Sequence, residues 1–568
     1  MLASRLHALG IFALALAWLA YDHYRPWVNF HSEALALLGI GLLVMSRCLH
    51  PVNAMALAPR LVWWVMAVAL LPWLQYLLGI SLFAGDALMA SFYLSALGAS
   101  IWLGYGYVTA LPAREAGPAP VFYMLWLVAL ISAAIGLLQW LNLQGSLAMY
   151  VVQTDPGDRA MGNLGQPNQL ATLLLIGIAA LAWTFEQRRI GGLGLGVGVG
   201  FLSAVLVLSQ SRAGMLSAIA ITVFLVWKSS STPGRLTPKY VLLWLLAYGA
   251  GVFMLPHASE FLLMGEARSM RVGADSARIE VWTQMLSAIG QSPWLGYGWN
   301  QTFTAQIAGS AAMPGAVPFT YAHNIVLDLL VWNGIPVGLA LVTAGGYWFV
   351  SRIRRLTRPS AVYAMACLLP IGVHSMVEYP FAYAYFLVAT GLMVGIVEAS
   401  HPGVVAIKLR LRWVGSALTI WLVLGSYMIY EYLLIEEDFR VVRFENLRIG
   451  QTPSEYKAPQ IWMLSHMGAM LQAARQPVVP GMKKDDLENL RKASLRFPYQ
   501  NLGTRYAFAL GLNGDPSGAT QQMTVIRNLH GDGYYLNAVN LLRALQQEKY
   551  PELSNVVTQG VARNASTN

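Results

Sequence analysis

Long apolar stretches recur along the first 432 residues of this 568-residue chain, and they limit what it can fold into. A helix of about 20 apolar residues crosses the roughly 30 Å hydrocarbon core of a membrane. Hydrophobic residues make up 56% of the chain and charged residues only 11%, which excludes a soluble globular protein. The sequence therefore predicts an all-α fold, a polytopic transmembrane helix bundle whose first apolar segment is a retained span rather than a cleaved signal peptide. Thirteen spans are expected, at residues 6–21, 34–49, 61–80, 87–108, 121–141, 169–185, 191–209, 213–227, 240–256, 322–350, 361–378, 381–398 and 413–432.

The basic residues between these spans favour one orientation in the membrane. Lys and Arg are retained on the cytoplasmic side during insertion, so we expect the N-terminus inside, the C-terminus in the periplasm, and a multi-pass protein of the bacterial inner membrane. The cytoplasmic side then holds Arg5, Arg47, Arg60, Arg114, Arg188, Arg189, Lys228, Arg235, Lys239, Arg352, Arg354, Arg355, Arg358, Lys408, Arg410 and Arg412. Before the tail, the periplasmic side holds only Arg25, Arg159, Arg212, Arg268, Arg271 and Arg278.

Residues 433–568 have a different composition. They contain 15 of the 37 Lys and Arg residues and 12 of the 27 Asp and Glu residues, and no apolar run long enough to span a membrane. We therefore divide the chain into a transmembrane domain at 1–432, which includes a periplasmic loop at 257–321, and a periplasmic helical domain at 433–568. Within the tail, Tyr506-Ala507-Phe508-Ala509-Leu510 and the turn and helix after it resemble tetratricopeptide helical hairpins. Apolar residues at helical spacing predict tail helices at 484–495, 501–512, 516–529 and 534–547.

The arginines expected on the periplasmic side are concentrated near two segments. Arg212 lies in a short polar hinge between two apolar runs, and the long loop carries Arg268, Arg271 and Arg278 within eleven residues. Like charges at this spacing repel one another unless an anion lies among them. The simpler alternative for Arg212 is an interfacial arginine whose guanidinium reaches the lipid headgroups.

Arg278 also begins a predicted amphipathic helix that ends before Pro293. Backbone amides at a helix N-terminus and guanidinium groups both favour a diphosphate. The alternative is a surface helix whose arginines pair with neighbouring carboxylates. The apolar stripe of the helix is Ile279, Trp282, Leu286 and Ile289, and the alternative partners are Glu266, Asp275 and Glu280.

His323 lies at the outer end of an apolar stretch of about 29 residues. That stretch is longer than a bilayer requires, so we expect it to protrude, tilt or kink, and it is interrupted at Asn333-Gly334-Ile335-Pro336. A histidine at the membrane rim is often only an interfacial polar residue. Near an arginine cluster, however, a neutral imidazole is well suited to accept a proton at neutral pH.

Two further polar motifs are expected on the same side. The run from Gly162 to Gln169 is dense in amides, which could bind sugar hydroxyls or phosphate, or could simply form a turn that caps the next helix. His374 and Glu378-Tyr379-Pro380 place a carboxylate and a phenol at a turn between two spans.

These motifs together resemble the PglL-type bacterial O-oligosaccharyltransferases, members of the O-antigen ligase and polymerase superfamily. The resemblance rests on residues 162–169, Ser-Arg-Ala-Gly at 211–214, Tyr-Ala-His-Asn at 321–324 and Glu-Tyr-Pro at 378–380. It implies transfer of a preassembled oligosaccharide from undecaprenyl diphosphate to a Ser or Thr hydroxyl of a periplasmic protein, commonly a type IV pilin. It also implies His323 as the catalytic residue, Arg212, Arg271 and Arg278 as diphosphate ligands, and Asn163, Gln166, Asn168, Asn324, Glu378 and Tyr379 as glycan or acceptor ligands.

The implied chemistry needs one base. A hydroxyl is a poor nucleophile until its proton is removed, whereas a lipid diphosphate leaves as a weakly basic anion. We therefore expect neither a metal nor another cofactor, and the expected partners are the lipid-linked oligosaccharide, the acceptor protein and membrane lipids, with no nucleic acid.

Other functions stay open on the sequence alone. An O-antigen ligase would use similar chemistry on lipid A-core, and a glycan polymerase is closely related. A transporter or flippase would carry ionisable residues near the middle of the membrane, often in repeated halves. Here the ionisable residues that are candidates for a site gather at the outer rim, apart from Asp328. A non-catalytic scaffold for envelope assembly is a further alternative.

Overall fold

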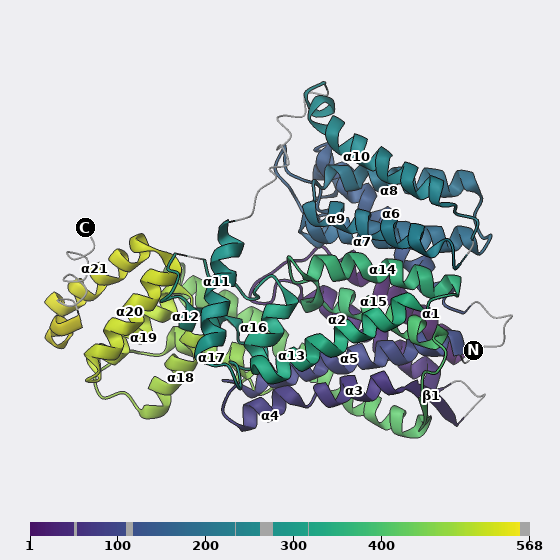
Figure 1. The fold of residues 1–568 in the computed structure, drawn as a ribbon. Coiled ribbons are helices and arrows are strands. Elements are labelled where there is room, and N and C mark those ends of the chain that lie inside the picture. Colours follow the sequence, from purple (N-terminus) through teal and green to yellow (C-terminus); the bar gives the residue numbers. More distant parts are fainter. Residues whose placement is uncertain (50–53, 110–116, 233, 262–275, 316, 557–568) are drawn as a thin grey trace. The chain divides into compact units, whose positions relative to one another are not determined.

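A computed structural model gives the fold of the chain (Figure 1). It describes residues 1–49, 54–109, 117–232, 234–261, 276–315 and 317–556. These residues form mainly α-helices and separate into two compact units. Unit 1 comprises residues 1–69, 92–272 and 345–425, and unit 2 comprises residues 70–91, 273–344 and 426–568.

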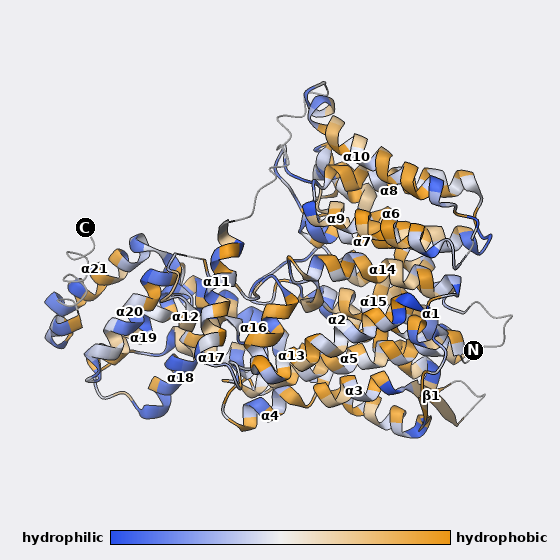
Figure 2. Ribbon diagram, in the orientation of Figure 1, coloured by the Kyte–Doolittle hydropathy of each residue, from blue (hydrophilic) through white to orange (hydrophobic). Residues whose placement is uncertain are grey.

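Unit 1 is a bundle of apolar helices, and the apolar residues dominate α6, α8 and α10 in Figure 2. Its helices are α1 (Leu2–Ala17), α2 (Phe30–Cys48), α3 (Arg60–Val68), most of α5 (Ala84–Thr109), α6 (Ala119–Trp140), α7 (Pro167–Glu186), α8 (Gly192–Leu208), α9 (Arg212–Lys228), α10 (Pro238–Phe261), α14 (Pro359–Ser375) and α15 (Ala384–Ser400). Short 3-10 turns are η1 (Gln144–Leu147), η2 (Gly162–Leu164) and η3 (Pro380–Ala382). Helices α13 (Ile325–Arg354) and α16 (Leu411–Leu447) each begin in one unit and end in the other.

Eight helices in the described part of the chain are long and apolar enough to cross a membrane. Four shorter apolar helices accompany them, so the predicted class, an all-α membrane protein with several spans, is confirmed. The number thirteen and the sidedness stay predictions. The eight are Phe30–Cys48, Arg60–Leu77, Ala84–Thr109, Ala119–Trp140, Pro167–Glu186, Pro238–Glu260, Ile325–Arg354 and Leu411–Leu447.

Glycines let the backbones of α5 and α15 approach closely. A Cβ atom added at Gly395 would lie 2.2 Å from the Ile101 carbonyl oxygen, and one at Gly104 would lie 2.1 Å from the Leu392 carbonyl oxygen. No side chain fits at either distance. Small residues at helix contacts are typical of membrane proteins, where packing rather than the hydrophobic effect holds helices together.

Two short strands in unit 1 were not expected from the sequence. β1 (Met55–Pro59) pairs antiparallel with β2 (Ala406–Arg410), and Leu57 lies opposite Lys408. The strands lie immediately before α3 and α16 along the chain. The two strands are some 350 positions apart in the sequence, so no local pattern indicates that they pair.

Unit 2 combines the tail with segments from the first 344 residues. Four of the tail helices match the predicted ranges within two residues, because their apolar periodicity is strong and Gly and Pro mark their ends. Helix α17 and the extension of α16 beyond residue 432 were not predicted, and the domain boundary at 433 stays a prediction. The other elements of unit 2 are α4 (Leu71–Leu77), α11 (Ser276–Gln291), α12 (Thr302–Gly309), α17 (Ser465–Arg475), α18 (Lys484–Arg496), α19 (Gln500–Leu512), α20 (Pro516–His530), α21 (Asp532–Glu548) and η4 (Pro551–Leu553).

Of the three outcomes expected for the overlong apolar stretch, α13 shows a kink. Gly334 has a φ of 71° and a ψ of 173°, which breaks the helix two residues before Pro336. The break leaves backbone groups without helical partners. The carbonyl oxygens of Val331 and Trp332 accept from the amides of Tyr297 (2.9 Å) and Gly298 (3.0 Å), so the preceding loop replaces the missing bonds.

Candidate active site

The amide-rich segment forms a tight turn before α7. Gly162 and Gly165 have φ values of 60° and 69°, which favour glycine, and Pro167 begins the helix with its fixed φ. Gln166 is the residue before the helix, half-buried, and its side chain makes no hydrogen bond within the described part of the chain. Its amide is therefore available to a ligand.

Asn163 has a different position. Its side chain is 3% exposed, its Nδ2 donates to the carbonyl oxygens of Leu19 (2.8 Å) and Tyr150 (2.9 Å), and its Oδ1 accepts from the Val152 amide (3.2 Å). Both donors and the acceptor are thus used inside unit 1. Asn163 therefore stabilises the turn through these hydrogen bonds.

Asn168 joins three motifs that are distant in sequence. Its Oδ1 accepts from Ser211 Oγ at 2.7 Å, and its Nδ2 donates to Glu378 Oε1 at 3.4 Å. One turn further along α7, Thr172 Oγ1 lies 2.9 Å from His374 Nδ1. Unit 1 therefore brings together the amide-rich turn, the Ser-Arg-Ala-Gly motif and the Glu-Tyr-Pro motif, as a shared site requires.

Arg212 begins α9 at this cluster and its side chain is exposed. Ser211 caps the helix, because its Oγ accepts from the Gly214 amide at 2.9 Å. Arg159 was not predicted, but its Nε donates to the Ser209 carbonyl oxygen (2.8 Å) and its Nη2 to Asn168 Oδ1 (3.4 Å). A guanidinium, a second guanidinium nearby and a helix N-terminus form a site that favours an anion.

Glu378 and Tyr379 follow α14. Glu378 is 5% exposed and Tyr379 is half-buried, with its ring stacked on Tyr383 at a centroid distance of 5.9 Å. Burial, together with the adjacent Glu378 carboxylate, raises the pKa of Tyr379. The phenol therefore stays protonated at neutral pH and can donate a hydrogen bond.

His323 lies in unit 2, in the loop that precedes α13. Its φ is 57°, a left-handed conformation that is uncommon for residues other than glycine. Its Nδ1 lies 3.0 Å from the Tyr321 carbonyl oxygen, and its ring packs edge-on against Phe319. A carbonyl oxygen only accepts, so Nδ1 is the protonated nitrogen and Nε2 carries the lone pair of the neutral imidazole.

Helix α11 holds the His323 loop in place. Trp282 Nε1 donates to the Ala322 carbonyl oxygen at 2.9 Å, and Arg278 lies one helical turn before Trp282 on the same face. The fully buried Gln284 donates to the Met313 carbonyl oxygen at 2.6 Å. Unit 2 therefore brings the helix that carries Arg278 and the loop that carries His323 together.

The predicted apolar stripe of α11 is only partly buried. Ile289 is 8% exposed, but Ile279 and Leu286 are 50% and 60% exposed. Val281 and Met285 form the buried face instead.

Two residues beside His323 position the loop. Asn324 Oδ1 accepts from the amides of Val326 (3.0 Å) and Leu327 (3.2 Å), which caps α13. The fully buried Asp328 accepts from the Ala322 amide (2.9 Å) and from Thr302 Oγ1 (3.1 Å) through its Oδ1. Asp328 was noted in the sequence only as a residue away from the rim, because its loop partner is not visible from spacing.

Arg271 and Arg268 lie outside the described residues, as do the alternative partners Glu266 and Asp275. Within the described ranges, no group of three or more His, Cys, Asp and Glu residues is arranged to hold a metal ion.

Three family models match the chain. "Protein glycosylation ligase" matches residues 160–185, "O-Antigen ligase" matches 197–342, and "Virulence factor membrane-bound polymerase, C-terminal" matches 362–541. The general O-oligosaccharyltransferase of Acinetobacter baylyi is 28% identical over 544 residues, 92% of each chain. The ComP-specific O-oligosaccharyltransferase of the same organism is 25% identical over 397 residues, 69% of this chain and 71% of that protein.

The chain is therefore similar to O-oligosaccharyltransferases over nearly its whole length. The segments that match the three family models contain every predicted site residue. The amide-rich turn lies in the first segment, the arginines, His323 and Asn324 in the second, and Glu378 and Tyr379 in the third.

Proposed function

We propose that the chain transfers a preassembled oligosaccharide from undecaprenyl diphosphate to a Ser or Thr hydroxyl of a periplasmic protein such as a type IV pilin, at the periplasmic face of the bacterial inner membrane. The names of the two relatives support a protein acceptor. The observation that carries the proposal is the geometry of His323, whose Nδ1 lies 3.0 Å from the Tyr321 carbonyl oxygen, a contact that orients the imidazole.

His323 acts as the general base in this proposal. Its Nε2 takes the proton of the acceptor hydroxyl while the hydroxyl oxygen forms a bond to the anomeric carbon of the sugar. The bond between that carbon and the diphosphate oxygen breaks, and the lipid diphosphate leaves with the electron pair as an anion. The leaving group needs no proton, because a diphosphate is weakly basic.

The cationic residues stabilise the departing diphosphate. We assign this role to Arg212, Arg271 and Arg278, since guanidinium groups bind phosphate oxygens in a bidentate manner and their attraction grows as charge develops. Arg159, which contacts Asn168, is a further cation of the unit 1 cluster.

The polar residues divide into two groups. We assign Gln166, Glu378 and Tyr379 to the glycan or acceptor, because they present a donor or an acceptor beside the cluster. Asn163, Asn168 and Asn324 were expected to bind ligand as well, but their side-chain contacts support positioning roles.

The test is a transfer assay in a cell that supplies a lipid-linked glycan and either a pilin or a lipid A-core acceptor, read by intact mass. His323→Ala should lower pilin modification by ~10²–10⁴-fold with normal membrane insertion. His257→Ala, at an exposed histidine of α10, is the matched control. Restoration of transfer by added imidazole would support the base role. Substantial residual transfer by His323→Ala would remove it, and modification of the core lipid alone would favour an O-antigen ligase.

A further inference from the structure

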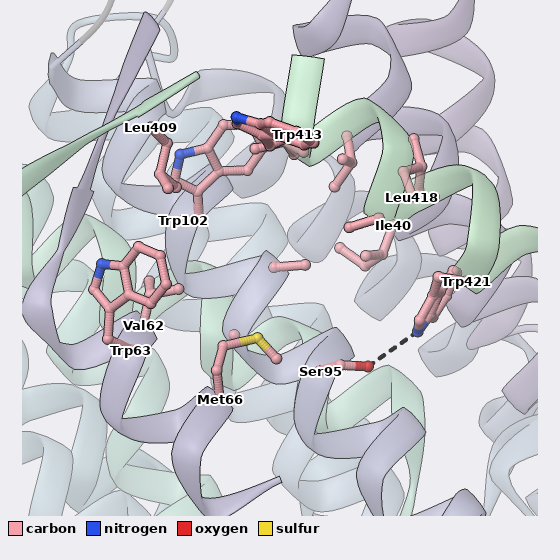
Figure 3. Close-up of a pocket in the computed structure, with 16 residues that line it drawn as sticks. Ile40, Val62, Trp63, Met66, Ser95, Trp102, Leu409, Trp413, Leu418 and Trp421 are labelled. Carbon is pink, nitrogen blue, oxygen red and sulfur yellow. Dashed lines mark hydrogen bonds between the residues drawn. The ribbon is translucent and has the colours of Figure 1, made fainter. Parts of the chain in front are cut away.

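Unit 1 contains an apolar cavity that has no part in the proposed reaction. Its volume is about 350 Å³, and α2, α3, α5, β2 and the first turns of α16 line it (Figure 3). The wall is made of aliphatic side chains and four tryptophans, Trp63, Trp102, Trp413 and Trp421. Pockets of roughly 300–1,000 Å³ are typical of small-ligand sites.

One polar group in the wall lacks a partner. The Trp421 N–H donates to Ser95 Oγ at 3.0 Å, so this indole has a hydrogen-bond partner within the protein. The Trp102 side chain is 3% exposed, and its Nε1 finds no acceptor among the described residues. Figure 3 shows the Trp102 nitrogen at the end of the cavity where Leu409 and Trp413 lie. A buried N–H without an acceptor is rare and points to one that a ligand supplies.

That same end is bordered by positive charge. The Arg47 guanidinium lies 5.1 Å from the centre of the Trp102 ring, and the Arg412 guanidinium lies 5.2 Å from that of Trp413. Leu409 of β2 lines the cavity, whereas its exposed neighbours Lys408 and Arg410 lie on the other face of the strand. The site thus has an apolar interior, an unpaired donor and a cationic rim, the pattern of a lipid with an anionic headgroup.

We propose that the cavity holds one acyl chain of an anionic phospholipid. The chain fills the tryptophan-lined interior, an ester or phosphate oxygen accepts from Trp102 Nε1, and Arg47 and Arg412 face the phosphate. A phospholipid is preferred over the polyprenyl donor because these cations belong to the group expected in the cytoplasm, where anionic lipids attract Lys and Arg near the membrane. The donor diphosphate is expected at the opposite face.

Native mass spectrometry of the full chain in detergent tests the proposal. The probes are phosphatidylglycerol and phosphatidylethanolamine with the same acyl chains, and undecaprenyl diphosphate. We expect one tightly held phosphatidylglycerol per chain. Ala417→Phe, which fills the cavity, should lower its retention by at least about tenfold. Ala247→Phe, at an exposed position of α10, is the matched control and should retain it.

Two further variants separate loss of binding from loss of folding. Arg412→Gln removes only a charge, so it should keep the bound chain and lose the preference for phosphatidylglycerol over phosphatidylethanolamine. Trp102→Phe removes the N–H together with part of the indole ring, so it should weaken the retention of both phospholipids, which share the ester and phosphate oxygens. Arg189→Gln, at another exposed arginine, should keep the preference. Equal retention by Ala417→Phe and Ala247→Phe would overturn the proposal, as would displacement of phosphatidylglycerol by undecaprenyl diphosphate at equal concentration. Neither outcome affects the assignment of His323, which a transfer assay measures.

Discussion

A buried ion pair within unit 2 gives a sharp test of what holds this unit together. Arg496, the last residue of α18, contacts Asp86 in the first turn of α5, and their side chains are 11% and 2% exposed. Two guanidinium nitrogens, Nε and Nη2, lie 2.9 Å from Asp86 Oδ1, and Gln301 Nε2 donates to Oδ2 at 3.0 Å. Arg496→Met leaves the carboxylate buried with Gln301 as its remaining side-chain hydrogen-bond donor, and breaking a buried pair in this way costs ~3–5 kcal/mol.

The same helix carries a matched control. Arg491 pairs with Glu488 through two contacts of 2.7 Å, but the side chains are 41% and 44% exposed. Arg491→Met should therefore cost no more than ~1 kcal/mol, because water screens the pair and replaces its contacts. The two variants make the same substitution on one helix and differ in burial.

Thermal unfolding of the full chain in detergent, followed by tryptophan fluorescence, measures the difference. For a domain of 150–250 residues, 1 kcal/mol shifts Tm by ~2–4 °C, so Arg496→Met should lower Tm by roughly 6–20 °C. The double variant Asp86→Asn/Arg496→Met should recover part of the loss, since the orphaned charge is gone. If Arg496→Met lowered Tm no more than Arg491→Met, burial would not determine the strength of this pair.

Two further expectations follow from the same structure. Burial lowers the pKa of His466 from 6.5 to about 4, against the opposing effect of Asp86. Between pH 6.5 and about 4 the imidazole is protonated in the unfolded chain but neutral in the folded chain. The contribution of His466 to the free energy of unfolding is therefore fully present above pH 6.5, and it falls by up to about 3 kcal/mol as the pH drops to about 4. Melting curves at pH 7.5 and 4.5 should show a larger loss for the wild type than for His466→Gln, and equal losses would contradict the argument. Asn163→Ala should lower Tm, because three backbone groups lose their hydrogen-bond partner at ~0.5–1.5 kcal/mol each. Gln166→Ala should leave Tm nearly unchanged and lower transfer up to about tenfold, because one neutral hydrogen bond contributes ~0.5–1.5 kcal/mol. The opposite pattern would make Gln166 the positioning residue and Asn163 the ligand-binding residue.

Local sequence patterns predicted the elements whose determinants are local. The tail helices follow from apolar spacing and from Gly and Pro at their ends, and the kink in α13 follows from Gly334 and Pro336 in an overlong apolar stretch. Helix α17 escaped prediction because its buried face mixes His466 and two alanines with only two large apolar residues, Met470 and Leu471. The β1–β2 pair escaped because its two strands are far apart in the sequence.

The candidate site shows why residue type alone cannot assign a role. Asn163, Gln166 and Asn168 occur in one run of eight residues, and the sequence treats them as equal ligands. In the folded chain, Asn163 is saturated by backbone groups, Asn168 joins two other motifs, and Gln166 keeps its amide for a ligand. The difference depends on which groups the rest of unit 1 places within reach, and that is a property of tertiary structure.

Histidine 323 illustrates the complementary case, in which the local chain itself prepares a functional group. The left-handed backbone at His323 directs its Nδ1 to a carbonyl oxygen two residues earlier, so the basic nitrogen is selected within a segment of three residues. The loop has little regular structure to hold this conformation, and its fixed shape depends on Trp282, Asp328 and Asn324. A strained residue persists only where its surroundings over-determine it. Asp328→Asn, which keeps the size of the side chain and weakens its contact with the Ala322 amide, should therefore lower transfer while leaving donor binding intact, and a loss of donor binding instead would show that Asp328 acts on the substrate site rather than on the base.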